Sequence, residues 1–189
     1  METAQKWALK SVPIFDSSEI ISALIDKGDE LLSDVAFCTY WFLEELFYMA
    51  CRIDNDDSIN LGNAYKQRCF EVVSKIFETV YQNDDMGFEQ LQHLYNLYQG
   101  IAGYEAKSGK NEETVRCNLE RAMECCEKSA SVKNHMLTHP MLYGLRVADA
   151  PSDNTMNLKL MKKTLAEKAY DDFRYCEWFQ KLESRLTAF

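Results

Sequence analysis

Two histidines spaced four residues apart, His135 and His139, are the first residues whose spacing suggests chemistry. On a helix they would place two imidazoles on one face. Zinc needs three or four ligands, however, and no Cys-x-x-Cys or His-Glu-x-x-His pattern accompanies the pair. Pro140 also disturbs a helix at this point. We therefore expect no metal and no cofactor here, only a loop with two solvated histidines.

Seven cysteines are the next candidates, as nucleophiles. A catalytic cysteine needs a positioned base and surroundings that stabilise the thiolate, and nothing local indicates either. The number is odd, and the adjacent Cys125 and Cys126 have poor geometry for an ordinary disulfide. We interpret the cysteines as reduced core residues of a cytoplasmic protein.

Paired carboxylates could support acid–base catalysis, but here they are more typical of solvated faces or helix N-termini. The pairs are Glu44-Glu45, Glu112-Glu113 and Asp171-Asp172. We predict no catalytic residues, and an enzyme of unknown reaction is the least favoured class.

Amide and aromatic side chains alternate along a predicted helix that begins near Met86. Amides can hydrogen-bond a peptide backbone, and tyrosines supply flat apolar contact. In arrays of helix pairs, the first helix of a pair usually lines the concave face. We expect a partner-binding groove with its amides open to solvent, formed by Gln92, Tyr95, Asn96 and Gln99. The alternative of core tyrosines and merely solvated amides stays open.

A hairpin of two amphipathic helices must position these side chains, with a break at residues 108–111. The apolar residues of both helices recur at i, i+3, i+4 and i+7. They are Leu91, Leu94, Tyr98, Ile101 and Ala102, then Val115, Leu119, Ala122, Met123 and Cys126. Ala102 and Ala122 lie where two close-packed antiparallel helices would touch. The pattern is that of a tetratricopeptide-type pair, a unit that binds partners and rarely catalyses.

The whole chain, 1–189, reads as one all-α domain, a tetratricopeptide-like antiparallel helical array (an α-α superhelix). No proline lies between Pro13 and Pro140, and no Asn-Gly or Asp-Gly turn marks a strand pair. Short helices are expected within 1–28, at about 3–10 and from 16 through 25. The main helix pairs occupy 29–130, with helices at about 29–53 and 59–81 before the hairpin. An irregular segment and helices at about 154–168 and 173–187 complete 131–189.

The helix at 29–53 is apolar on most of its circumference. Its main stripe is Leu31, Val35, Cys38, Phe42, Leu46, Met49 and Ile53, with five aromatic residues off it. Such a helix is buried on more than one side. We place it at the centre of the domain or in a homodimer interface. The helix at 59–81 has one apolar face, formed by Leu61, Tyr65, Cys69, Val72, Ile76 and Val80.

The formal net charge of -9 and the sequence pI of about 4.9 limit the partners. An acidic surface repels phosphate backbones and anionic lipid, so this chain is expected to bind neither nucleic acid nor membrane. Residues 1–10 have no apolar core suited to a signal peptide. The uncharged run 35–43 is shorter than the roughly 20 residues of a membrane-spanning helix. A peptide or another protein is the expected partner.

Several of these segments together resemble a known family. They are residues 84–88, 106–113, Leu119-Glu120-Arg121-Ala122, 170–174, and Trp178-Phe179 with Leu182. They are similar to the tetratricopeptide-like C-terminal region of Cro/XRE-type helix-turn-helix transcriptional regulators from low-GC Gram-positive bacteria. The resemblance covers roughly 31–186. It lacks the Trp-x-x-Leu-Gly opening of a well-formed repeat, the repeat-ending proline and the N-terminal DNA-binding module.

The resemblance implies a regulatory domain of a bacterial transcriptional regulator that binds a ligand or protein and oligomerises. DNA binding is not assigned to these residues. A free-standing cytosolic protein-interaction adaptor is the alternative.

Overall fold

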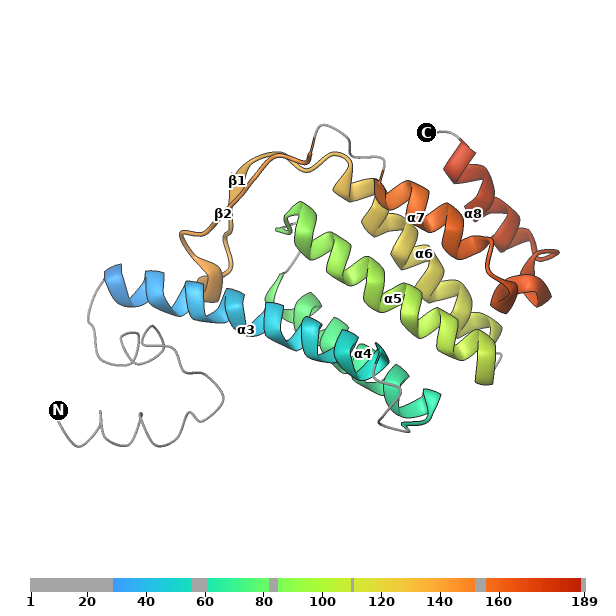
Figure 1. Ribbon diagram of the computed structural model, residues 1–189. Coiled ribbons are helices and arrows are strands. Elements are labelled where there is room, and N and C mark those ends of the chain that lie inside the picture. The colour runs from blue at the N-terminus through green and yellow to red at the C-terminus, as the bar shows by residue number, and fades with distance from the viewer. Residues whose placement is uncertain (1–28, 56–60, 82–84, 110, 152–155, 188–189) are drawn as a thin grey trace.

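A computed structural model describes residues 29–55, 61–81, 85–109, 111–151 and 156–187 of this chain (Figure 1). The elements in chain order are α3 (Asp29–Asn55), α4 (Asn63–Val80), α5 (Phe88–Ser108), α6 (Glu112–Ser129), β1 (His135–Met136), η1 (Pro140–Leu142), β2 (Arg146–Val147), α7 (Met156–Leu165), η2 (Lys168–Phe173) and α8 (Glu177–Thr187). The predicted all-α class is confirmed. The short helices predicted within 1–28 lie outside the described residues.

The predicted hairpin, α5 with α6, forms the centre of the domain. All ten residues assigned to its inner faces are buried, and Ala102, Val115, Leu119, Ala122, Met123 and Cys126 are fully so. Helix α5 packs on α6 along one side and on α4 along another. In Figure 1 the helices follow one another from α3 and α4 through α5 and α6 to α7 and α8. The spacing of apolar residues therefore predicted both helices and the faces by which they pack.

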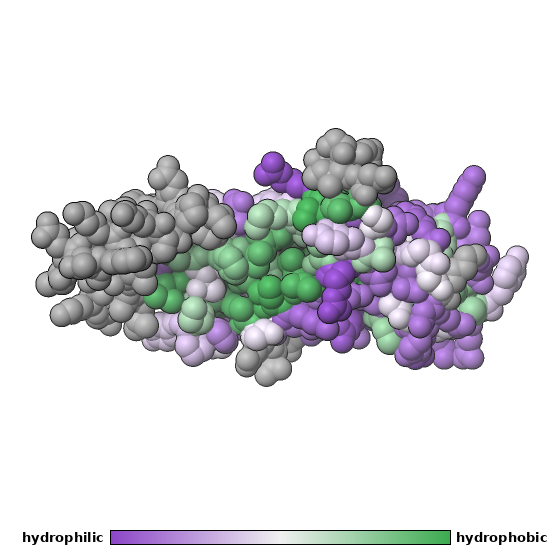
Figure 2. Space-filling model, turned by 90° about the horizontal axis from the view of Figure 1, so that it is seen from below, coloured by the Kyte–Doolittle hydropathy of each residue, from purple (hydrophilic) through white to green (hydrophobic). Residues whose placement is uncertain are grey.

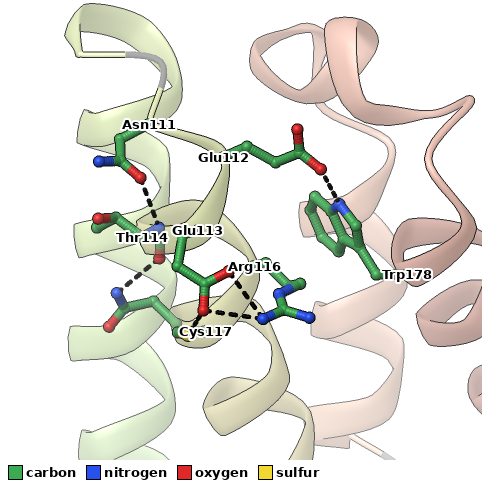
Figure 3. A network of polar contacts seen from close by, with 8 residues as sticks. Asn111, Glu112, Glu113, Thr114, Arg116, Cys117 and Trp178 are labelled. Carbon is green, nitrogen blue, oxygen red and sulfur yellow. Dashed lines mark hydrogen bonds and ion pairs between the residues drawn. The ribbon is translucent and has the colours of Figure 1, made fainter.

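Polar contacts at the start of α6 fix the turn of the hairpin and attach α8 (Figure 3). The side chain of Asn111 caps the helix by accepting a hydrogen bond from the Thr114 amide, at 3.1 Å. The indole N–H of Trp178 donates to Glu112 Oε1 at 2.8 Å, which joins α8 to α6. Farther along, Arg185 of α8 makes two bonds to the Glu127 carboxylate, at 2.9 and 2.6 Å. The last helix therefore covers α6.

The segment expected to be irregular contains a short two-stranded antiparallel hairpin, which no strand or turn signal in the sequence indicated. His135 pairs with Val147 and Met136 with Arg146. The turn uses Gly144 at φ +87°, a conformation that glycine adopts without strain. The strands are only two residues long, too short for alternation to reveal. From the end of α6 the chain runs through β1 to η1, which packs against α3, and β2 then leads it back toward α7.

The C-terminal helices are shorter than predicted. Helix α7 ends at Leu165 and α8 begins at Glu177, and the 3-10 helix η2 fills the interval that the sequence had left between the two predicted helices. The Tyr170 and Phe173 side chains of η2 are buried in the core. No helix among the described residues is long and apolar enough to cross a membrane.

Candidate functional site

The most unusual feature of the described surface is a set of exposed apolar side chains on α3 and α4. We call it the outer apolar surface; its members are Phe37, Trp41, Phe42, Tyr48 and Met49 of α3 and Tyr65 and Val72 of α4. Trp41 and Tyr48 are each about half exposed, at 49% and 51%. Figure 2 views the molecule from the side on which α3 lies and shows apolar side chains gathered in the middle of that face. Contiguous apolar surface of this kind marks interaction sites.

This surface exists because α3 and α4 are apolar on two sides. Their inner sides are buried through Leu43, Phe47 and Ala50 of α3, and through Phe70, Val73 and Phe77 of α4. The stripes predicted to be the packed faces are half-buried or exposed wherever their burial is described. Leu46, Ile76 and Val80 pack against the edge of the core, whereas Phe42, Met49, Tyr65 and Val72 are exposed. The predicted packing faces were therefore wrong in part for both helices, and α5, not α3, is the central helix.

A buried polar contact sets the rotation of α3 about its axis. Glu44 points inward and is only 6% exposed, and its Oε2 lies 2.8 Å from Nε2 of His93 on α5. Phe47 stacks on the same imidazole, with ring centroids 3.9 Å apart and an interplanar angle of 7°. The ring of Tyr48, which belongs to the outer apolar surface, stands edge-on to that of His93, with ring centroids 6.1 Å apart. Because Leu43, Phe47 and Ala50 face inward, Trp41 and Tyr48, which lie about 100° or more around the helix from each of them, face outward.

Further contacts hold the two ends of α3. The Tyr40 hydroxyl donates to Glu89 Oε2 at 3.2 Å. Burial, aided by the nearby charges of Glu44 and Glu89, raises the pKa of Tyr40, so this hydroxyl keeps its proton. At the other end, Lys66 Nζ donates to the Asp54 carbonyl at 2.6 Å, and the Tyr104 hydroxyl donates to the Asp54 carboxylate. The outer apolar surface is thus presented by a helix fixed along its length.

The predicted groove on α5 is only partly accessible. Tyr95 is 2% exposed, and its hydroxyl lies 3.0 Å from Thr164 Oγ1 of α7, so the expectation that it lines an open groove was wrong. Burial raises the pKa of Tyr95 to about 12, as befits a core tyrosine. Gln92, Asn96 and Gln99 are half-buried, and their part in partner binding stays a prediction.

Two hollows lie beside the β1–β2 hairpin, with volumes of about 770 and 500 Å³. From α5 the larger is lined by Leu91, and the smaller by residues 87–90, which form the first turn of the helix. The three predicted amides lie farther along α5 than both linings. The helix therefore contributes its N-terminal end, not its amide row, to these concave regions.

The histidine pair does not share a helical face. His135 lies on β1 with Nε2 3.5 Å from Asp85 Oδ1, and the ring of His139 caps η1 by accepting from the Met141 amide at 3.2 Å. Asp85 also accepts from the Thr138 amide and hydroxyl, so its carboxylate anchors the hairpin. Among the described residues, no three His, Cys, Asp or Glu side chains are grouped as metal ligands would be. These residues are thus engaged in structural contacts.

The acid pairs and thiols also have structural surroundings. Glu44 is buried, which corrects its assignment to a solvated face, whereas Glu45 is exposed. The seven cysteines are free thiols. Burial raises the pKa of Cys125 to about 12 and that of Cys126 as well, so both remain protonated at neutral pH. Protonated, buried thiols are poor nucleophiles.

Comparison with known proteins identified no matching family model, no similar curated protein and no similar solved structure.

Proposed function

We propose that this chain is a protein-interaction and oligomerisation domain whose binding site is the outer apolar surface of α3 and α4. The observation that carries the proposal is the double-sided character of these helices. Their inner sides already form the core, while Trp41 and Tyr48 on the outer side keep about half of their surface exposed in the described chain. Exposed tryptophan and tyrosine are the residue types that contribute most to binding energy at protein interfaces.

In its finer form, the proposal is that this chain is the regulatory half of a bacterial transcriptional regulator and forms a tetratricopeptide-like array. The resemblance of residues 31–186 to such regulators supports this form, as does the close-packed α5 and α6 pair. The free thiols support a reducing compartment, and we include a cytoplasmic location in the proposal. No catalytic step is assigned to the chain.

Photo-crosslinking tests the proposal in the cell that encodes this chain. A benzophenone amino acid replaces Trp41, at the centre of the outer apolar surface. The control carries the same group at Tyr175, an aromatic residue between η2 and α8 that is 90% exposed. We expect protein adducts from position 41 well above those from position 175. Equal adduct yields at the two positions would refute the interaction function, because exposure alone would then explain the labelling.

A further inference from the structure

We infer that the partner on the outer apolar surface is a second copy of this chain, docked with its α3 antiparallel to the first. This inference rests on the proposed interaction function and adds the identity and register of the partner. It derives from the order of charged and apolar residues along the outward side of α3.

The outward side of α3 has the spacing of a coiled-coil seam. Positions alternating by four and three residues share one face, the spacing by which two helices interlock. Those positions are Asp34, Cys38, Trp41, Glu45, Tyr48 and Arg52. Phe37 and Met49 flank the seam and are 40% and 41% exposed. The seam covers 19 residues, and its ends lie about 27 Å apart along the helix at 1.5 Å per residue.

Charge selects the direction of the second helix. Parallel and in register, the seam would place Asp34, Glu45 and Arg52 each against its own copy, three contacts between like charges. Such contacts oppose association. Antiparallel, a helix pair centred on position 43 brings Asp34 opposite Arg52 of the other copy. Because the axis is two-fold, this opposite-charge pair forms twice.

The same register matches the remaining residues. Position 43 is midway between 34 and 52, between 38 and 48, and between 41 and 45. Cys38 therefore lies opposite the second copy's Tyr48, and Trp41 lies opposite its Glu45. The indole N–H of Trp41 can donate to that carboxylate, as Trp178 does to Glu112 within this chain. One alignment thus pairs apolar with apolar, anion with cation, and donor with acceptor.

The charged ends are available for such pairing. Arg52 and Glu45 are exposed and Asp34 is half-buried. Within the described part of the chain, none of the three is in an ion pair. Charged residues in a seam lower its stability but fix direction and register. The outer apolar surface supplies the affinity, and these charges supply the orientation.

Charge exchange tests the inference. Sedimentation of the purified full chain gives the dimer dissociation constant for the wild type, Asp34→Arg, Arg52→Asp and the double variant. Each single variant creates two like-charge pairs and should weaken the dimer about tenfold to a hundredfold at low salt. The double variant restores opposite charges across the interface and should recover affinity close to that of the wild type. Lys162→Asp on the exposed side of α7 is the matched charge control and should leave the constant unchanged.

Two results would overturn the inference and leave the proposed function standing. The first is a single variant that matches the wild type, or a double variant that is not restored, since the antiparallel register would then be wrong. The second is a wild type that stays monomeric up to about 100 μM, which would mean that its affinity for itself is too low to be useful. In that case position 41 would still crosslink to another protein. Equal crosslinking at positions 41 and 175 would instead refute the proposed function itself.

Discussion

Two glycines in α5, three residues apart, should respond in opposite directions to replacement by alanine. Gly100 and Gly103 both lie inside the helix, where alanine is favoured by about 0.5–1 kcal/mol. Their surroundings differ. A Cβ at Gly103 would lie 3.5 Å from Tyr170 Oη, an ordinary contact. A Cβ at Gly100 would lie 2.3 and 2.5 Å from two ring carbons of Phe70.

The cost at Gly100 follows from how Phe70 is held. Its ring must move by about 1 Å to restore a normal contact. It is 4% exposed and stands edge-on to Tyr104, with centroids 5.9 Å apart. Overpacking a core site of this kind costs about 1–3 kcal/mol. After the gain in helix propensity, Gly100→Ala should lower the free energy of unfolding by about 0–2 kcal/mol. Gly103→Ala should raise it by about 0.5–1 kcal/mol.

Urea denaturation followed by far-UV circular dichroism measures both values, and a third variant tests the mechanism. Phe70→Leu leaves space beside α5, so Gly100→Ala should cost less in that background by about 1 kcal/mol. If both alanines shift stability in the same direction, the close approach of α4 to α5 is not as described. If Phe70→Leu brings no relief, the ring is not the cause of the cost.

Three further predictions concern the polar contacts. Glu44→Ala leaves the buried His93 without its partner and should lower the free energy of unfolding by about 1–3 kcal/mol in chemical denaturation. Asp85→Ala removes the acceptor of the Thr138 amide and hydroxyl, so the amides of the hairpin should exchange with deuterium faster while those of α5 do not. Cys125, whose pKa of about 12 in the fold falls to about 8.5 on unfolding, should resist alkylation in the native protein. Because the unfolded state loses this proton first, stability should fall as pH rises from about 8.5 to 12.

Each of these has its control. Glu124→Ala, at an exposed position of α6, should change stability by less than about 0.5 kcal/mol, and an effect equal to that of Glu44→Ala would contradict the burial argument. For Asp85, faster exchange throughout the molecule would mean global destabilisation and not release of the hairpin. For Cys125, mass spectrometry locates the label, and modification before unfolding would contradict the burial of this thiol. Cys125→Ser should reduce the alkaline loss of stability.

By itself the sequence determined the helical class, the central hairpin and its inner faces. Leu91, Leu94, Leu119 and Ala122 lie at helical spacing, so the sides on which α5 and α6 meet could be read from the pattern. The second buried side of α5, with Tyr95 and Leu97, was not predicted. The break at 108–111 and the cap at Asn111 follow from local chemistry in the same way. These are interactions within a few residues along the chain, which is why the sequence reveals them.

The tertiary structure alone decided which sides of α3 and α4 are inside. Both helices are apolar on two faces, and periodicity cannot tell which of two apolar faces meets a neighbour. Contacts between residues distant in sequence settle it, through Glu44 and Phe47 on His93 and through Phe70 on Gly100. The sequence did not reveal the β1–β2 hairpin for a related reason. Its strands are only two residues long, and contacts with distant residues such as Asp85 hold it in place. The surface proposed to bind a partner therefore combines members of the predicted stripes, such as Phe42 and Met49, with aromatic residues outside them, such as Trp41, that the fold leaves exposed.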